Sequence, residues 1–189
     1  MNSRAKEIIL IGGSAGAYKL IVEIMDALPI SFACSIVILL HRNERYSTQM
    51  EETLSSQLGR RIQQASDKGE ILEGNIYFAP PGYHLLIEPN ISFSLDVSER
   101  IQFSRPSIDV LFETAADVYG ANCTAFLLSG ANRDGSDGLR IIRNLGGRAI
   151  VQSPTDAQIS FMPSYAIESI GEVEVYNNNQ IINYFKTLN

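Results

Sequence analysis

Short runs of apolar residues alternate with helix-like segments along the first part of the chain. Two compact apolar runs, Glu7–Ile11 and Ser35–Leu40, are typical of strands buried in a sheet. Ala17–Leu28 carries apolar residues at helical spacing, which predicts an amphipathic helix, and a second helix is predicted over Thr48–Leu58. This order of strand, helix, strand and helix predicts a parallel sheet with helices packed on its faces.

The middle of the chain has a different pattern, in which short apolar segments are separated by tight turns. The segments are Ile76–Ala79, Tyr83–Glu88 and Ile91–Val97, and the turns between them contain Pro and Gly or Pro and Asn. Turns this short favour a hairpin or meander over helical crossovers. We therefore expect a short antiparallel region in the middle of the chain.

Helices and strands alternate again in the last part of the chain. The predicted elements are helices over Pro106–Tyr119, Ser136–Leu145 and Gln180–Leu188 and strands over Cys123–Leu128 and Arg148–Val151. No internal repeat, low-complexity tract or linker is visible in the sequence. We therefore expect one domain over residues 1–189.

The composition limits the classes of function. The chain has 189 residues, of which 45% are apolar and 19% charged, as in soluble globular proteins. Its net charge of -6 argues against general nucleic-acid binding, which needs a basic face. The longest apolar run, Ile30–Leu40, is about half a membrane span, so no membrane insertion is expected. No secretory signal opens the chain, and Cys34 and Cys123 lie in apolar runs, which favours buried thiols in a reducing, cytoplasmic setting.

Candidate chemistry is sought at the carboxyl ends of the predicted strands, where open α/β sheets bind their ligands. The first strand runs into Gly12-Gly13-Ser14-Ala15-Gly16. Gly12, Ser14 and Gly16 fit the G-x-S-x-G spacing, in which small residues let a nucleophilic serine project from a tight turn before a helix. A sharp turn with Ser14 as a simple helix cap is the alternative. The glycine spacing of a dinucleotide fold and the Gly-Lys pair of a P-loop are both missing from the sequence.

A serine nucleophile needs a base, and the chain has two histidines. His41 ends the second predicted strand, at the sheet edge where Ser14 is expected, whereas His84 lies in the turn-rich middle of the chain. Position therefore favours His41 as the base, with an ordinary rim histidine as the alternative. Arg42 follows directly and could orient a carboxylate of the substrate or simply face solvent.

An acid that orients the histidine is expected after a third strand. The loop Leu127–Gly138 leaves an apolar run and carries Asp134 and Asp137. Asp137 is expected in the first turn of the next helix, so Asp134 is the better candidate for a carboxylate that stabilises an imidazolium. A loop whose aspartates only cap the helix is the alternative. Two separated cysteines and two histidines lack the spacing of a zinc or iron–sulfur site, so no metal is expected.

These three segments resemble the catalytic domain of the CheB-type chemotaxis protein-glutamate methylesterases. Further segments that share the likeness are Phe103–Phe112, Ile76–His84 and Phe161–Pro163. The resemblance implies a doubly wound, mostly parallel α/β sheet with helices on both faces and a Ser-His-Asp triad. In that triad Ser14 is the nucleophile, His41 the general base and then acid, and Asp134 the carboxylate that orients the histidine. The resemblance implies no metal and no organic cofactor.

Several residues depart from the usual pattern of that family. Ala15 stands where the family usually has a threonine, and Ser104 stands where a histidine is frequent. Ala131 replaces a methionine, although its backbone N–H could still donate to an oxyanion. Arg133 places a cation beside Asp134 in the sequence, where it could stabilise the carboxylate or point to solvent.

The resemblance also implies a substrate and partners. The family hydrolyses glutamate methyl esters on chemoreceptors, releasing methanol, and some members deamidate receptor glutamines. We therefore expect a methylesterase that acts on methylated cytoplasmic helices of a receptor. The usual N-terminal receiver domain is absent before Met1, so an open site controlled by a separate receiver or signalling protein is expected. An inert binding module of a signalling complex and an esterase or amidase for small molecules are the alternatives.

Overall fold

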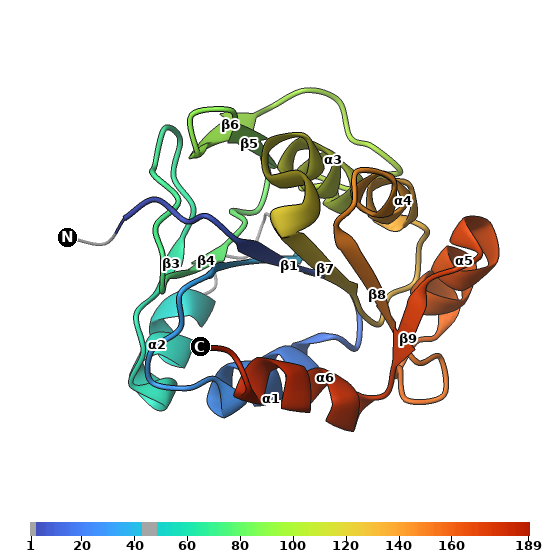
Figure 1. The fold of residues 1–189 in the computed structure, drawn as a ribbon. Helices are drawn as coiled ribbons and strands as arrows, with labels where there is room; N and C mark the ends of the chain where they lie inside the picture. The colour runs from blue at the N-terminus through green and yellow to red at the C-terminus, as the bar shows by residue number, and fades with distance from the viewer. Residues whose placement is uncertain (1–2, 43–48) are drawn as a thin grey trace.

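A seven-stranded sheet in the order β3-β4-β2-β1-β7-β8-β9 forms the centre of the molecule (Figure 1). The computed structural model describes residues 3–42 and 49–189. Every pairing within this sheet is parallel. The strands are β1 (Ile8–Gly13), β2 (Ser35–Leu40), β3 (Ile62–Gln64), β4 (Ile76–Phe78), β7 (Cys123–Leu127), β8 (Arg148–Gln152) and β9 (Glu174–Tyr176). The expected parallel α/β sheet is therefore confirmed.

Helices cover both faces of the sheet, as expected. One face carries α1 (Tyr18–Ala27), α2 (Met50–Leu58) and α6 (Asn178–Lys186), and the other carries α3 (Ile108–Tyr119), α4 (Ser136–Asn144) and α5 (Phe161–Ile170). The hairpin of β5 (His84–Glu88) and β6 (Ser92–Asp96) is antiparallel and lies beside α3 (Figure 1). Among the described residues no helix is both long and apolar enough to cross a membrane.

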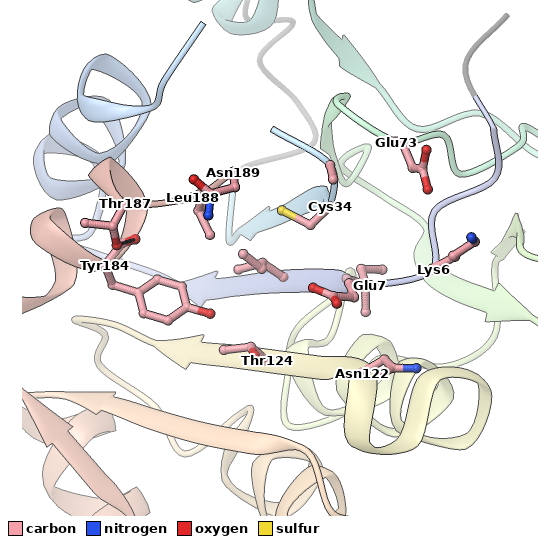
Figure 2. Close-up of a pocket in the computed structure, with 13 residues that line it drawn as sticks. Lys6, Glu7, Cys34, Glu73, Asn122, Thr124, Tyr184, Thr187, Leu188 and Asn189 are labelled. Atoms are coloured by element: carbon pink, nitrogen blue, oxygen red, sulfur yellow. Dashed lines mark hydrogen bonds between the residues drawn. The ribbon is translucent and has the colours of Figure 1, made fainter. Parts of the chain in front are cut away.

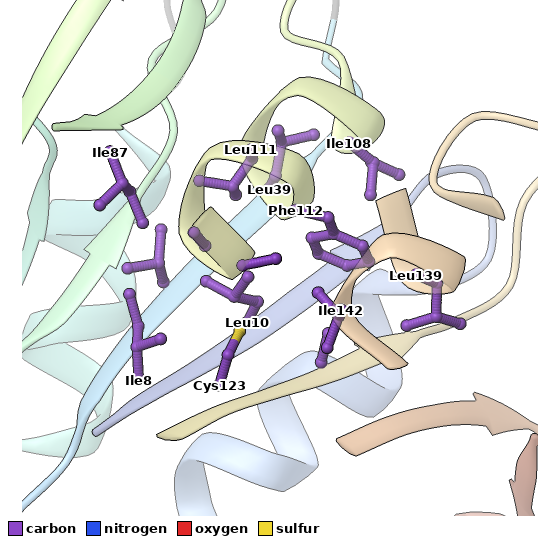
Figure 3. Close-up of a cluster of buried hydrophobic side chains, with 14 of the residues drawn as sticks. Ile8, Leu10, Leu39, Ile87, Ile108, Leu111, Phe112, Cys123, Leu139 and Ile142 are labelled. Carbon is purple, nitrogen blue, oxygen red and sulfur yellow. The ribbon is translucent and has the colours of Figure 1, made fainter. Parts of the chain in front are cut away.

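The sheet separates two hydrophobic cores, because successive residues of a strand point to opposite faces. In β1, Ile8 and Leu10 belong to the core under α3, α4 and α5, whereas Ile9 and Ile11 belong to the core under α1, α2 and α6. Figure 3 shows the first of these cores, where Phe112 of α3 lies close to Ile142 of α4 above the sheet. Strands buried on both faces explain the unbroken apolar runs in the sequence.

Four details differ from the sequence-based expectation. Ile76–Ala79, expected in the antiparallel region, contains β4, which pairs in parallel with β2 and β3. Strands β3 and β9 and helix α5 were not predicted: the two strands have only three residues each, the side chains of β9 are largely exposed, and Pro163 interrupts the helical pattern of α5. The predicted start of the second helix, Thr48, lies outside the described residues.

Candidate active site

The register of the sheet brings Ser14 and His41 to the same edge. Gly13, the last residue of β1, is paired with Leu40, the last residue of β2, so the next residue of each strand is Ser14 or His41. The backbone N–H of His41 donates to Gly13 O at 3.1 Å, which extends the parallel ladder by one step. The two side chains that were predicted to act together therefore leave neighbouring strands at matching positions.

Ser14 opens a tight turn between β1 and α1. Ala17 N donates to Ser14 O at 3.1 Å, and Gly16 within this turn has a φ of 84°, in the left-handed region that favours glycine. A Cβ atom at Gly16 would also lie 2.6 Å from Ser129 Oγ. The glycine is thus required both by the backbone and by the space, and the turn leaves Ser14 partly exposed.

Ser129, which sequence reasoning did not single out, fastens the Ser14 turn to the end of β7. Its carbonyl accepts from Ser14 N at 2.9 Å, and its Oγ donates to Ala15 O at 2.8 Å. Gln152 at the end of β8 accepts from Ser129 N at 2.7 Å. The signal in the sequence for this role is a serine at the end of the apolar run Cys123–Leu128, and the structure buries it fully.

His41 and Asp134 are joined by a hydrogen bond of 2.9 Å between His41 Nε2 and Asp134 Oδ2. The Asp134 side chain is fully buried, and 14% of the His41 side chain is exposed. Because Asp134 engages Nε2, the other ring nitrogen, Nδ1, is the one left to exchange a proton with a substrate or nucleophile. The structure thus brings together a histidine and an acid that are 93 residues apart in the chain.

The N-terminus of α3 holds Asp134 in its ionised form. Asp134 accepts from the backbone N–H groups of Ile108 at 2.8 Å and Asp109 at 3.0 Å, and from Ser107 Oγ at 2.7 Å. Burial by itself would raise the pKa of Asp134, but the hydrogen bonds from His41 and from α3 outweigh it and hold this pKa below its usual value. Asp134 therefore caps α3 from a distant loop, and the helix dipole favours its negative charge.

The capping between α3 and α4 is reciprocal. Asp109, in the first turn of α3, accepts from Gly138 N of α4 at 2.8 Å. A Cβ atom at Gly138 would lie 2.6 Å from Phe112 Cβ, so glycine is required where the two helices meet. Burial raises the pKa of Asp109 to about 7, and the nearby Asp134 carboxylate adds to this shift. The acid that orients His41 is thus fixed by two packed helices.

We expect Asp109→Asn to stabilise the protein increasingly as the pH rises. With a raised pKa, the folded state keeps a proton between pH 3.8 and about 7 that the unfolded chain releases, so the parent loses stability across this window. The asparagine keeps an acceptor for Gly138 N and does not ionise. Urea unfolding should show a free-energy advantage of the variant that grows by roughly 1–3 kcal/mol between pH 4 and 7.5.

The exposed Asp117, also on α3, supplies the matched control. Asp117→Asn should show a difference from the parent that stays nearly constant with pH. An Asp109→Asn difference that is equally flat would contradict the burial of an unfavourable charge at this position.

The second histidine, His84, is buried and bonded to the backbone through both ring nitrogens. His84 is 1% exposed, its Nδ1 accepts from Ser107 N at 3.2 Å, and its Nε2 donates to Glu99 O at 3.0 Å. Both ring nitrogens are therefore engaged with backbone groups. His84 supports the residue that precedes α3, and so acts on Asp134 only through Ser107.

The two arginines considered from sequence both have partners other than Asp134. Arg133 is exposed, and its Nε donates to Gln102 Oε1 at 2.8 Å, so the solvent-facing alternative describes it. Arg42 forms an ion pair of 2.6 Å with Glu51 and donates to Ala79 O at 3.0 Å. Arg42 is therefore held by α2 and β4 rather than facing solvent.

Two hollows in the surface lie at opposite edges of the sheet. A pocket of about 180 Å³ at the carboxyl edge is lined by His41, Arg42, Arg100 and residues 103–106. A larger cavity of about 450 Å³ lies at the other edge, where Glu7, Cys34, Thr124 and Tyr184 face it (Figure 2). Both cysteines are free and buried, as expected, and no group of acids, histidines and cysteines suited to a metal occurs among residues 3–42 and 49–189.

Comparison with known proteins gives consistent matches over nearly the whole chain. The model of a family described as CheB methylesterase matches residues 9–185. A protein of Leptospira interrogans, named provisionally as a protein-glutamate methylesterase/protein-glutamine glutaminase, is 43% identical over 95% of this chain and 93% of its own length. The protein-glutamate methylesterase FrzG of Myxococcus xanthus is 30% identical over 85% of this chain, which spans 48% of FrzG. The crystal structure of the Thermotoga maritima CheB methylesterase catalytic domain superimposes with a TM-score of 0.89 at 27% identity, over 95% of this chain and 97% of that one.

Proposed function

This chain belongs to the CheB methylesterase family and is an enzyme of the protein-glutamate methylesterase class, and we propose that Ser14, His41 and Asp134 form its catalytic triad. The observation that carries this assignment is the hydrogen bond of 2.9 Å between His41 Nε2 and the buried Asp134 Oδ2. It lies at the sheet edge where Ser14 follows the neighbouring strand. A buried carboxylate that fixes a histidine beside a serine is the arrangement that activates a hydroxyl for acyl transfer.

In the proposed reaction, Ser14 Oγ attacks the carbonyl carbon of a glutamate methyl ester while His41 Nδ1 takes the hydroxyl proton. The imidazolium then gives this proton to the methoxy oxygen, and methanol leaves. A water molecule attacks the resulting acyl-serine with His41 again as the base, which releases glutamate and restores Ser14. Asp134 stabilises the imidazolium in both steps, and its low pKa keeps it ionised at neutral pH.

The departures from the usual family motif leave the main-chain part of this mechanism in place. Ala131 follows Gly130, whose own N–H donates to Ile159 O at 3.1 Å. We assign the backbone N–H of Ala131 to the oxyanion, since that donor does not depend on a methionine side chain. Ala15 offers no hydroxyl, so any polar help at that position comes from the backbone.

The proposed substrates are methylated cytoplasmic helices of chemoreceptors, with a separate receiver or signalling protein as regulator and the cytoplasm as the location. The relatives named as protein-glutamine glutaminases support deamidation as a second activity. The chemistry is the same, with ammonia in place of methanol as the leaving group. We also propose that residues 1–189 act as one catalytic domain.

Methanol release from a methyl-esterified chemoreceptor fragment tests this function, and a serine-directed phosphonate tests the nucleophile. Methanol release together with labelling of Ser14 is the expected result. Labelling without release from the receptor would favour a small-molecule esterase. Neither labelling nor release would favour the inert binding module.

Substituting each histidine in turn should distinguish the catalytic role of His41 from the structural role of His84. His41→Gln is expected to lower kcat by on the order of 10³-fold or more, because Ser14 loses its base. His84→Gln should instead lower the melting temperature, since Ser107 N loses a buried acceptor, a change worth roughly 1–3 kcal/mol. Activity measured at temperatures where each variant is folded checks this. A severe loss of kcat only in the His84 variant would reverse the assignment.

A further inference from the structure

A strained turn lies beside the candidate active site. Ile101 N donates to Ser104 O at 3.1 Å and Ser104 N donates to Ile101 O at 2.8 Å, which closes a two-residue turn. The central residues, Gln102 and Phe103, have φ angles of 49° and 66°. Turns with positive φ at both central positions favour Asn and Gly, so an aromatic residue is unfavourable for the backbone here.

The side chain of Phe103 is also unfavourable for solvation. It is 96% exposed, and it contributes to the lining of the same pocket as His41. Neither backbone conformation nor burial in the folded protein explains an aromatic residue at this turn. Strain and apolar exposure next to a catalytic group point to contact with a partner.

The charges around Phe103 indicate the chemistry of that partner. Arg100 and Arg105 line the same pocket. Arg105 Nη1 donates to the carbonyls of Val97 and Ser98, each at 2.9 Å, and these neutral acceptors do not offset its charge. Arg100 is exposed at the rim and already takes part in an interaction of its own. On a chain with a net charge of -6, this edge is suited to carboxylates.

A second exposed aromatic residue lies near Ser14. Phe161, the first residue of α5, is 54% exposed. The next residue, Met162, donates its N–H to Gly130 O at 3.0 Å, and a Cβ atom at Gly130 would lie 3.1 Å from Ser14 Cβ. Phe161 is therefore a further exposed aromatic residue close to the Ser14 turn.

We propose that the turn Ile101–Ser104 is a docking element for an acidic helical segment of the substrate protein. Phe103 covers an apolar side chain of that segment, and Arg105 faces its carboxylates, so that the esterified glutamate reaches Ser14. The inference rests on the proposed function. It adds that the carboxylates flanking an esterified glutamate determine which glutamates of the substrate protein are hydrolysed.

Binding is measured with the Ser14→Ala protein, so that the result does not depend on turnover. The probe is a fluorescein-labelled helical peptide with one glutamate methyl ester flanked by Asp and Glu. Phe103→Gly should weaken binding about tenfold, with a melting temperature at or above that of the parent because glycine fits the positive φ. Phe103→Tyr should bind as the parent does, and Ile30→Ser, a change at an equally exposed apolar residue, should have no effect.

A second peptide with Asn and Gln in place of the flanking acids tests the charges. It should bind more weakly than the acidic peptide, and the difference should shrink in high salt and in Arg105→Gln. Equal binding of Phe103→Gly and the parent, or equal binding of the two peptides, would overturn the docking proposal. Methanol release from the acidic peptide by the parent enzyme is scored separately: its absence alongside Phe103-dependent binding would refute the proposed function and not the docking surface.

Discussion

Ser14→Ala should abolish hydrolysis of glutamate methyl esters while leaving the fold intact. Ser14 is partly exposed on its turn, and its backbone donates to Ser129 O and accepts from Ala17 N, so neither contact involves the hydroxyl. The loss of the nucleophile is expected to lower kcat by on the order of 10³-fold or more, as for other nucleophiles of serine triads. Methanol release and a thermal melt on the same preparation check both halves of the expectation.

Ser169→Ala is the matched control for this change. Ser169 is an exposed serine on α5, and alanine is well accepted in a helix. Its activity and melting temperature should equal those of the parent. Parent-like turnover by Ser14→Ala would show that another group attacks the ester.

Asp134→Asn should lower both activity and stability. Asp134 accepts four hydrogen bonds, from His41, Ser107, Ile108 and Asp109, whereas an asparagine has only one acceptor oxygen for them. At least one donor would face the amide N–H₂ group, which costs about 2–4 kcal/mol in a buried site. Loss of the oriented histidine should reduce kcat by on the order of 10³–10⁴-fold.

Asp137→Asn separates the role of Asp134 from a general effect of acids in the same loop. Asp137 is exposed and pairs with Arg140 one turn along α4. Exposed pairs of this kind contribute about 0–1 kcal/mol, so the control should keep its activity and nearly all its stability. Urea unfolding and methanol release for both variants give the comparison. If Asp137→Asn had the larger effect on kcat, the acid of the triad would be misassigned.

The same network predicts the response to acid. The pKa of Asp134 is below its usual value in the folded protein, so its contribution to stability is present above the unfolded pKa. That contribution is lost as the pH falls through the folded pKa, where the N-terminus of α3 loses its anionic cap. Asp109 changes stability with pH in the opposite direction, because its raised pKa favours the neutral form in the folded state.

Local sequence pattern determined the parts of this protein that depend on near neighbours. Apolar runs identified the strands β1, β2, β7 and β8, because a strand covered on both faces has few polar residues. Placing reactive residues at strand ends then selected Ser14, His41 and Asp134, because parallel strands end at one edge of a sheet. The His41–Asp134 hydrogen bond agrees with that reasoning.

Only the tertiary structure decided how those residues are held. The donors that fix Asp134 come from Ser107, Ile108 and Asp109, between 25 and 27 residues away, and the pKa of Asp109 depends on burial between two helices. Strand β4 belongs to the parallel sheet because it pairs with β2. A segment of three residues does not show in the sequence which strand it will pair with. Periodicity reports which side of an element is buried, whereas hydrogen bonds between distant segments and the charges they stabilise exist only once the chain has packed.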